Sequence, residues 1–260
     1  MDWNSIKDKL KEKTKGVESF ITKHVKNEIP KKCVVCDEYI IAGQYTIDSR
    51  GQVAHIHHKL EFCTTCGGII GKNEIRVSEN RVICELCNKT VVKTEAQVKW
   101  VEQKVRSIYK NVAIGEISQK VKIKIVTPQE LMKLFNQNTV NISQKGLTIS
   151  QETAKGIFDH NIYVLDYLPK VFFAGVLAHE MLHVWQNEKY LTPSPKVTEG
   201  FCNLGSYIVY KDIDNALANI LIKQLEADPD PVYGEGFRTI KNTFEKKGLQ
   251  YVINKIKTFK

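Results

Sequence analysis

The pattern of apolar positions is most continuous over residues 168–187, where it predicts a helix buried on nearly all sides. Its central part, residues 171–185, is apolar or glycine throughout, apart from His179, Glu180 and His183. A surface helix would show a polar face instead. The pattern therefore predicts a core helix with three ionisable side chains, each of which needs a partner when buried.

Two stretches have the pattern of strands. Residues 121–126 alternate between apolar residues and lysine, which is typical of a strand with one face in water. Residues 161–167 are rich in strand-forming residues and lead to Pro169, which suits a helix start. The Asn- and Gln-rich stretch 136–151 is expected to be a loop or hairpin.

Helical spacing predicts further helices in both halves of the chain. They are expected over 93–112, from Thr127, from Val197, over 207–225 and, in two short pieces divided at Gly248, over 236–259. Residues 1–30 have amphipathic spacing with interspersed lysines. Such a basic helix docks on the protein body or, alternatively, lies on a membrane surface or a partner. Together these elements predict an α+β fold in three parts, residues 1–30, 31–92 and 93–260.

Composition narrows the class of protein. The chain has 260 residues, 42% hydrophobic and 26% charged, which suits one solid core and a small module. The net charge of +9 is dispersed, so it favours nucleic acid no more than a solvated lysine surface does. The chain has no run of eighteen apolar residues and no apolar centre of a secretory signal near Met1. We therefore expect a cytoplasmic protein, and the charge alone gives little reason to expect a nucleic-acid partner.

Six of the seven cysteines form three C-x-x-C pairs. In a reducing compartment such pairs indicate metal binding, because each supplies two ligands for tetrahedral zinc. One complete set of four thiolates has 17 residues between its pairs: Cys63, Cys66, Cys84 and Cys87. The remaining pair, Cys33 and Cys36, is expected to bind a second zinc ion with His57.

This arrangement resembles a LIM domain, two zinc knuckles in series, except at one position. A LIM domain has a cysteine three residues after the histidine, where this chain has Leu60. The first site is therefore degraded or completed by His55, His58 or Glu61. In a second pairing, the first two C-x-x-C pairs form one site and the third recruits the histidines. Both alternatives predict bound zinc in a module that needs it to fold.

His179, Glu180 and His183 form an H-E-x-x-H motif. Two histidines four residues apart lie on one face of a helix and can bind one zinc ion, with Glu180 beside them as the general base. Zinc peptidases have a strand followed by this helix, and the strand edge, here 161–167, holds extended peptide. The third ligand is expected to be Glu199, 16 residues after His183. Alternatively, Glu199 is only an acid near a helix start.

The loop that follows residues 228–231 has two glycines around an acid. It would bring Tyr233 to the metal as the donor to the developing oxyanion, with Arg238 in reserve. It could equally be only a turn. Asn203 is a candidate to hold the far nitrogen of a ligand histidine, and Cys202 is expected to be a small buried hydrophobe.

These motifs together resemble the LIM-domain peptidases of the DA-one type, which include plant growth regulators activated by ubiquitin and shorter bacterial relatives. The likeness covers about residues 31–240. It rests on the cysteine block, the run His179–Trp185, Glu199-Gly200 and the run Tyr233–Arg238. It implies a zincin-like metallopeptidase domain behind a LIM-like module, with zinc held by His179, His183 and Glu199. It also implies a protein substrate, whereas the acidic ubiquitin-interacting helices of the family are missing here.

The sequence therefore predicts a zinc endopeptidase with one catalytic and one or two structural zinc ions. Its LIM-like module would bind a protein partner or regulate the enzyme. The alternative is a catalytically inactive LIM-type adaptor or a nucleic-acid-binding protein. The complete motif with its downstream glutamate favours the enzyme, because an inactive scaffold gains nothing from a buried acid beside an open metal position.

Overall fold

A computed structural model of the chain describes residues 31–41, 44–78, 80–136 and 144–259, so the helix expected over residues 1–30 lies outside the described residues. Contacts divide the chain into two compact units. The first comprises Met1–Glu61 and Gly68–Lys72, and the second Phe62–Gly67 and Asn73–Lys260. This division does not coincide with the boundary expected near residue 92, because the second zinc knuckle belongs to the larger unit.

The first unit has a small antiparallel sheet of β1 (Tyr45–Ile47) and β2 (Val53–His55), in which Tyr45 lies opposite His55. Its buried cluster within the described residues consists of Cys33, Ala54 and Ile69, and Val53 and Ile70 are also buried. So few small or medium side chains bury little apolar surface. A unit of this size usually needs a metal ion or a disulfide to stay folded.

The second unit begins with a knuckle that is joined to the main body by backbone hydrogen bonds. It contains β3 (Ile75–Ser78), the antiparallel β4 (Arg81–Ile83) and the short helix α2 (Glu85–Asn88). Immediately after it, the amide of Val92 donates to Leu168 O at 3.0 Å, and the amide of Lys170 donates to Thr90 O at 2.8 Å. These bonds fix the segment where the motif helix starts.

The main body is built on a three-stranded sheet in the order β5-β7-β6. β7 (Phe158–Leu165) is central, parallel to β5 (Val121–Val126) and antiparallel to β6 (Gly146–Glu152). The strand expected over 121–126 is confirmed. Of the stretch 136–151, expected to be a loop or hairpin, the last residues form β6, which pairs with β7 as a hairpin. The strand expected at 161–167 is not at an edge, because β6 lies between it and one side of the sheet.

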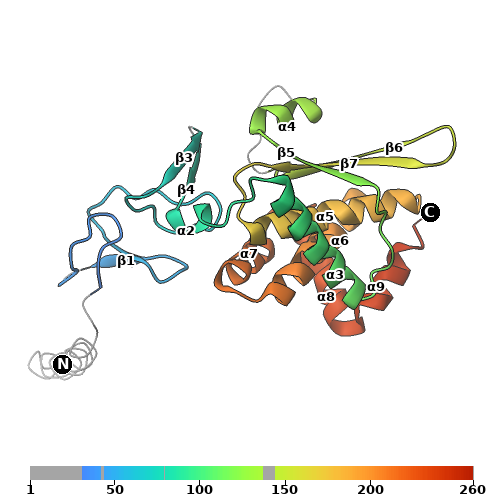
Figure 1. Cartoon of the computed structure of the whole chain (residues 1–260). Coiled ribbons are helices and arrows are strands. Elements are labelled where there is room, and N and C mark those ends of the chain that lie inside the picture. The colour runs from blue at the N-terminus through green and yellow to red at the C-terminus, as the bar shows by residue number, and fades with distance from the viewer. Residues whose placement is uncertain (1–30, 42–43, 79, 137–143, 260) are drawn as a thin grey trace, which may run out of the picture. The chain divides into compact units, whose positions relative to one another are not determined.

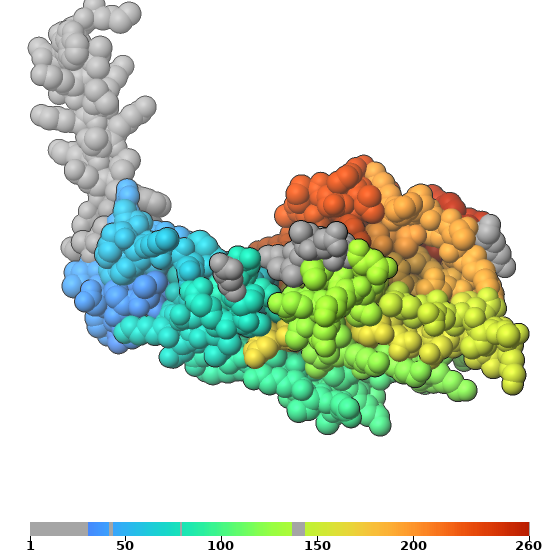
Figure 2. Space-filling view, turned by 90° about the horizontal axis from the view of Figure 1, so that it is seen from above, coloured from blue at the N-terminus to red at the C-terminus, as the bar shows by residue number. Residues whose placement is uncertain are grey.

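Helices cover both faces of this sheet (Figure 1). α5 (Lys170–Glu188) and α6 (Pro195–Ile213) lie below it, and α4 (Pro128–Leu134) lies on the other face. The remaining helices surround α5 and α6: α3 (Glu95–Asn111), α7 (Ala216–Ala227), α8 (Gly234–Lys247) and α9 (Leu249–Ile256). Capping boxes at Thr94 and Thr127 start α3 and α4. Figure 2, seen from above, shows the yellow residues of β6 and β7 at the surface of the second unit, with orange residues from later in the chain beside them.

The motif helix α5 is buried as predicted, and its largest fully buried side chains include Phe173, Met181 and Trp185. Its neighbour α6 packs closely because both helices have glycine at the contact. A Cβ atom at Gly175 would lie 2.1 Å from the hydroxyl of Tyr210, so a larger residue would push the helices apart. In the part of the chain that the structure describes, no helix is long and apolar enough to cross a membrane.

Candidate metal centres

His179 and His183 lie one turn apart on α5, and their Nε2 atoms are 3.1 Å apart. Glu199, in the second turn of α6, points its carboxylate at the same place. Its Oε2 lies 3.0 Å from His179 Nε2 and 3.6 Å from His183 Nε2. The structure therefore brings together the three residues that the sequence predicts as ligands.

The spacing of these atoms fits a zinc ion. With bonds of 2.0–2.1 Å, the ligand atoms of a tetrahedral zinc ion are about 3.3 Å apart. The three separations here, 3.0, 3.1 and 3.6 Å, lie on both sides of that value. The side chains are 13%, 21% and 17% exposed, so solvent reaches one side of the group. Three donors with one open side is the arrangement of a catalytic zinc site.

Without a metal ion, the histidines hold the acid in its charged form. Burial alone would raise the pKa of Glu199, but hydrogen bonds and positive charge from His179 and His183 outweigh it and lower the pKa to about 2. Burial likewise opposes protonation of His183, whereas Cys202 and Glu199 raise its pKa above the usual value. The metal-free centre is thus an ion pair, and a divalent cation replaces its protons.

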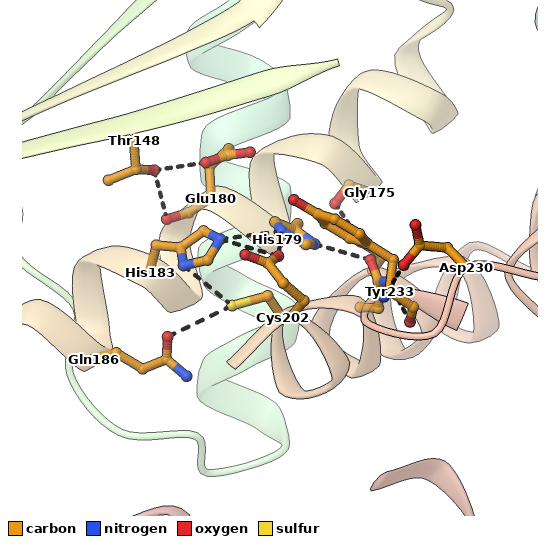
Figure 3. A network of polar contacts seen from close by, with 12 residues as sticks. Thr148, Gly175, His179, Glu180, His183, Gln186, Cys202, Asp230 and Tyr233 are labelled. Carbon is orange, nitrogen blue, oxygen red and sulfur yellow. Dashed lines mark hydrogen bonds and ion pairs between the residues drawn. The ribbon is translucent and has the colours of Figure 1, made fainter. Parts of the chain in front are cut away.

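Glu180 is only 5% exposed and is held by β6. The hydroxyl of Thr148 lies 2.8 Å from Glu180 Oε2 and 3.0 Å from the Glu180 carbonyl oxygen. Figure 3 shows Glu180 turned toward Thr148, with His179 and His183 beside it on the same helix. A Cβ atom at Gly146 would lie 2.5 Å from Glu180 Oε1, so the strand approaches this closely only because Gly146 has no side chain. Thr148 could not be predicted from the sequence, because the stretch around it has no clear pattern of apolar and polar positions.

Tyr233 lies alongside His179, with ring centroids 6.5 Å apart and an angle of 20° between the rings (Figure 3). Asn203 joins the two residues: its Oδ1 lies 2.9 Å from His179 Nδ1, and its amide nitrogen donates to Tyr233 O at 3.2 Å. This is the contact expected for Asn203. Burial, followed by the charges of Glu199 and Glu180, raises the pKa of Tyr233 to about 12, so its hydroxyl keeps its proton at neutral pH.

The glycines around Glu235 allow close backbone contacts that place Tyr233. A Cβ atom at Gly236 would lie 2.3 Å from Lys196 O, and one at Gly200 would lie 2.4 Å from the carbonyl of Gly236. α8 therefore starts directly against the first turns of α6. Arg238, the reserve oxyanion donor of the prediction, donates through Nη1 to Glu226 O at 3.1 Å and to Asp228 O at the end of α7.

Cys202 was expected to be a simple buried hydrophobe, and it is fully buried. Its Sγ also lies 3.6 Å from His183 Nδ1 and 3.7 Å from Gln186 Oε1. His179, His183 and Cys202 thus also offer ligand-type atoms within 4.8 Å of one another. The sulfur, however, faces Nδ1 of His183, whereas Glu199 faces Nε2, the nitrogen that also faces His179. We therefore place the metal on the Glu199 side.

The second candidate centre is the predicted set of four thiolates, Cys63, Cys66, Cys84 and Cys87, all of which are buried. With Zn–S bonds of 2.3 Å, two sulfurs of a tetrahedral site are about 3.8 Å apart. The measured separation of the Cys66 and Cys84 sulfurs is 3.8 Å. Hydrogen bonds from Cys66 and the other two thiols lower the pKa of Cys63 far below its usual range. The group therefore has the composition and spacing of a closed zinc site.

The third candidate centre, in the first unit, differs from the prediction at one residue. Its members are Cys33, Cys36, His55 and His58, and Cys36 Sγ lies 3.5 Å from His55 Nδ1. The buried Nε2 of His58 has no hydrogen-bond partner among the described residues, as expected of an atom reserved for a metal ion.

The predicted ligand His57 is not part of this group. It is exposed, and its ring stacks on His55 with a centroid distance of 5.0 Å. With His57 as the third ligand, the fourth would fall at position 60. That position is Leu60, which packs against the core of the first unit. The signal for the observed set was already present, because His55 and His58 have the separation of three residues that a LIM domain requires of its third and fourth ligands.

Comparisons with known proteins find one family model and two distant relatives. Residues 205–259 match the family model described as DA1-like, Protein DA1. Protein DA1 of Arabidopsis thaliana is 22% identical over 298 aligned residues, which cover 86% of this chain and 55% of that protein. Protein DA1-related 1 of the same plant is 27% identical over 128 residues, 37% of this chain and 23% of that protein. The chain thus spans about half the length of the first relative and less of the second.

No solved structure matches the chain. The family model and the two curated relatives all carry the name DA1. The chain is distantly homologous to Protein DA1 and DA1-related 1 of Arabidopsis thaliana, and its residues 205–259 match the DA1-like family model.

Proposed function

We propose that this protein is a zinc endopeptidase that hydrolyses peptide bonds of a protein substrate. The observation that carries the proposal is the convergence of two histidine Nε2 atoms and the Glu199 carboxylate, with Glu180 buried beside them. The distant homology to the DA1 family, whose members are peptidases, supports the same activity.

Zinc held by His179, His183 and Glu199 would supply an acidified water molecule and polarise the substrate carbonyl. Glu180 takes the proton from the attacking water and delivers it to the leaving amine. Thr148 binds Oε2 of Glu180, which leaves Oε1 to carry the proton. Fixing one oxygen in this way keeps the acceptor in position through both transfers.

The developing oxyanion needs a hydrogen-bond donor, and Tyr233 is the residue that we assign to this role. Its hydroxyl is protonated at neutral pH, and its ring lies beside His179. β6 is the strand that would hold an extended substrate, because it contacts the motif helix and lies at an edge of the three-stranded sheet of the described residues. Substrate main chain would pair with that edge.

The direct test is Glu180→Gln in the full chain. The amide keeps the shape of the side chain but cannot accept the proton, so peptide cleavage should fall by about 10²–10⁴-fold. Zinc content and thermal unfolding should stay at the wild-type level. Glu245→Gln, an exposed change on α8, is the matched control and should leave cleavage unchanged. Full cleavage by Glu180→Gln would remove Glu180 as the base.

The alternative function is an inactive zinc-binding adaptor that works through its cysteine modules. It would explain the closed thiolate site, but it gives no reason for a buried glutamate beside a partly open group of ligands. Cleavage of unfolded protein by the wild type, and its loss on metal chelation, separate the two functions. Partner binding through the first unit and a cytoplasmic location remain predictions.

A further inference from the structure

One face of α6 supplies three side chains to the histidines of α5. Glu199, Cys202 and Asn203 are spaced at i, i+3 and i+4, so they lie on the same side of the helix. Glu199 faces the Nε2 atoms, and the other two face the Nδ1 atoms: Asn203 that of His179, and Cys202 that of His183. Each histidine ring thus has a metal side, which is its Nε2 atom, and a supported side, which is the Nδ1 atom that contacts a side chain of α6.

The metal side determines where the ring protons lie. A neutral histidine that binds a metal ion through Nε2 carries its proton on Nδ1. Asn203 Oδ1 then accepts from His179 Nδ1 at 2.9 Å, and the sulfur of Cys202 accepts from His183 Nδ1 at 3.6 Å. The thiol proton is directed to Gln186 Oε1 at 3.7 Å. The two rings therefore have different supports, an amide oxygen and a sulfur.

A simple space-filling role does not explain this arrangement. Cys202 is 0% exposed and Gln186 is 3% exposed, so water does not replace a lost contact. An alanine or valine at position 202 would leave His183 Nδ1 and Gln186 Oε1 without this partner. Buried polar groups without partners are costly, so the thiol has a role beyond filling space.

We propose that Cys202 is a positioning residue that fixes the orientation and tautomer of His183 through a hydrogen bond to its sulfur. The proposal rests on the proposed function only in needing a metal ion at the open centre. Because sulfur is a weaker acceptor than an amide oxygen, His183 is the less firmly supported of the two ligands. The open centre should therefore release its metal more easily than one with two oxygen-supported histidines.

The test measures zinc affinity of the full chain at the open centre by competition with a chelator. Cys202→Ala should lower this affinity by about 10–100-fold, the usual effect of removing a group that holds a ligand histidine. Cys202→Ser should restore most of it, because a hydroxyl also accepts from Nδ1. The affinity of Glu180→Gln should equal that of the wild type, since Glu180 is not a ligand.

Ser206→Ala is the matched control for a structural effect. Ser206 lies one turn further along α6, is 4% exposed and donates to Gly175 O at 2.8 Å without touching either histidine. It should lower the melting temperature about as much as Cys202→Ala but leave zinc affinity unchanged. Equal zinc affinities for the two alanine variants would overturn the proposal.

The absorption spectrum of the cobalt(II) form shows whether Cys202 only supports His183 or binds the metal ion directly. With zinc kept in the cysteine centres and cobalt(II) in the open centre, the wild type should show no sulfur-to-cobalt charge-transfer band. A band that disappears in Cys202→Ala would make Cys202 a ligand and overturn the proposal. An open centre that binds no metal would overturn both this proposal and the peptidase. Absence of cleavage with the affinity pattern intact would overturn the peptidase alone.

Discussion

The second unit contains two candidate metal centres of opposite design. The four thiols of the knuckle are at most 5% exposed and surround their centre, whereas the three ligands on α5 and α6 are 13–21% exposed and leave one side open. Four protein ligands leave no room for substrate, and three do. In the zinc peptidase that we propose, the closed centre would therefore hold a structural zinc ion, and the open centre would hold the zinc ion that takes part in the reaction.

The largest effect should come from breaking the closed centre. Cys87→Ala removes one of four ligands, and structural zinc contributes on the order of 10 kcal/mol to folding in small zinc modules. Because residues 90–92 hold the start of α5, the open centre should weaken as well. Zinc stoichiometry and thermal unfolding measure both losses. A variant that melts like the wild type would contradict the structural role.

Cys36→Ala is the natural control for that experiment. It removes a ligand from the centre of the first unit, which the described contacts group apart from the motif helix. We expect one zinc ion fewer and an unchanged affinity at the open centre.

Removing a ligand of the open centre should affect metal binding and cleavage there but should leave the fold intact. Glu199→Gln removes the charged ligand, so the open centre should lose its zinc and cleavage should fall at least about 10²-fold, as for other residues essential to catalysis. The closed centre should keep its zinc and the chain should stay folded. Metal analysis after mild chelation measures both effects. Loss of zinc from the closed centre as well would show that the closed centre depends on the open one.

The link between the two centres can be weakened without touching either set of ligands. Arg81 of β4 is 5% exposed and contacts Asp166, just before the motif helix, through the carboxylate at 2.6 Å and the carbonyl oxygen at 2.7 Å. Removing one partner of a buried ion pair typically costs about 3–5 kcal/mol. Asp166→Ala should therefore lower the free energy of unfolding by roughly 3 kcal/mol. Lys104→Ala, from the half-exposed pair with Asp212, should change it by less than about 1 kcal/mol.

A smaller effect is expected from crowding the contact that places Tyr233. In Gly236→Ala the new Cβ would meet Lys196 O, so α8 must shift. Overpacking of this kind costs about 1–3 kcal/mol. Cleavage should fall more than metal affinity, because Tyr233 moves while the ligands remain. Gly248→Ala, with open space around its Cβ position but a φ of +80°, tests backbone strain alone and should leave cleavage unchanged.

Much of the open centre was predictable because its signals are local. The spacing of His179 and His183 within one helix, and the all-apolar residues around them, indicate both the element and its chemistry. Glu199 was found by its distance along the chain and by the likeness to a family. Thr148 and Cys202 were not, since their roles depend on how β6 and α6 pack against α5.

The first unit shows the opposite case. Its histidines are so close in sequence that composition cannot separate them, and only the three-residue spacing of His55 and His58 identifies the pair. The edge strand was also misplaced, because β7 has the stronger apolar pattern as the central strand of the sheet. The central strand β7 has fully buried side chains at every second position from His160 to Val164, whereas no side chain of the edge strand β6 is fully buried. The apolar pattern of β6 is therefore weaker, although β6 is the strand that contacts Glu180.

The smallest expected effect is on how the stabilisation by Glu199 changes with pH. This change should have opposite signs in the metal-free and the zinc-loaded chain. In the metal-free chain the pKa of Glu199 is lowered from 4.5 to about 2, so its contribution to stability is complete above about pH 4.5 and is lost as the pH falls toward 2. The pKa of His183 is raised above 6.5, so its contribution is complete below that pH and is lost as the pH rises through the folded value.

The ion pair should therefore stabilise the metal-free chain most between about pH 4.5 and 6.5. In the zinc-loaded chain the histidines must be neutral, so acidification over the same range releases zinc from the open centre. Subtracting the melting temperature of Glu199→Gln from that of the wild type isolates this contribution. We expect the difference to grow on acidification from about pH 8 to 6 without metal and to shrink with zinc. The same sign in both states would mean that zinc does not bind between these histidines.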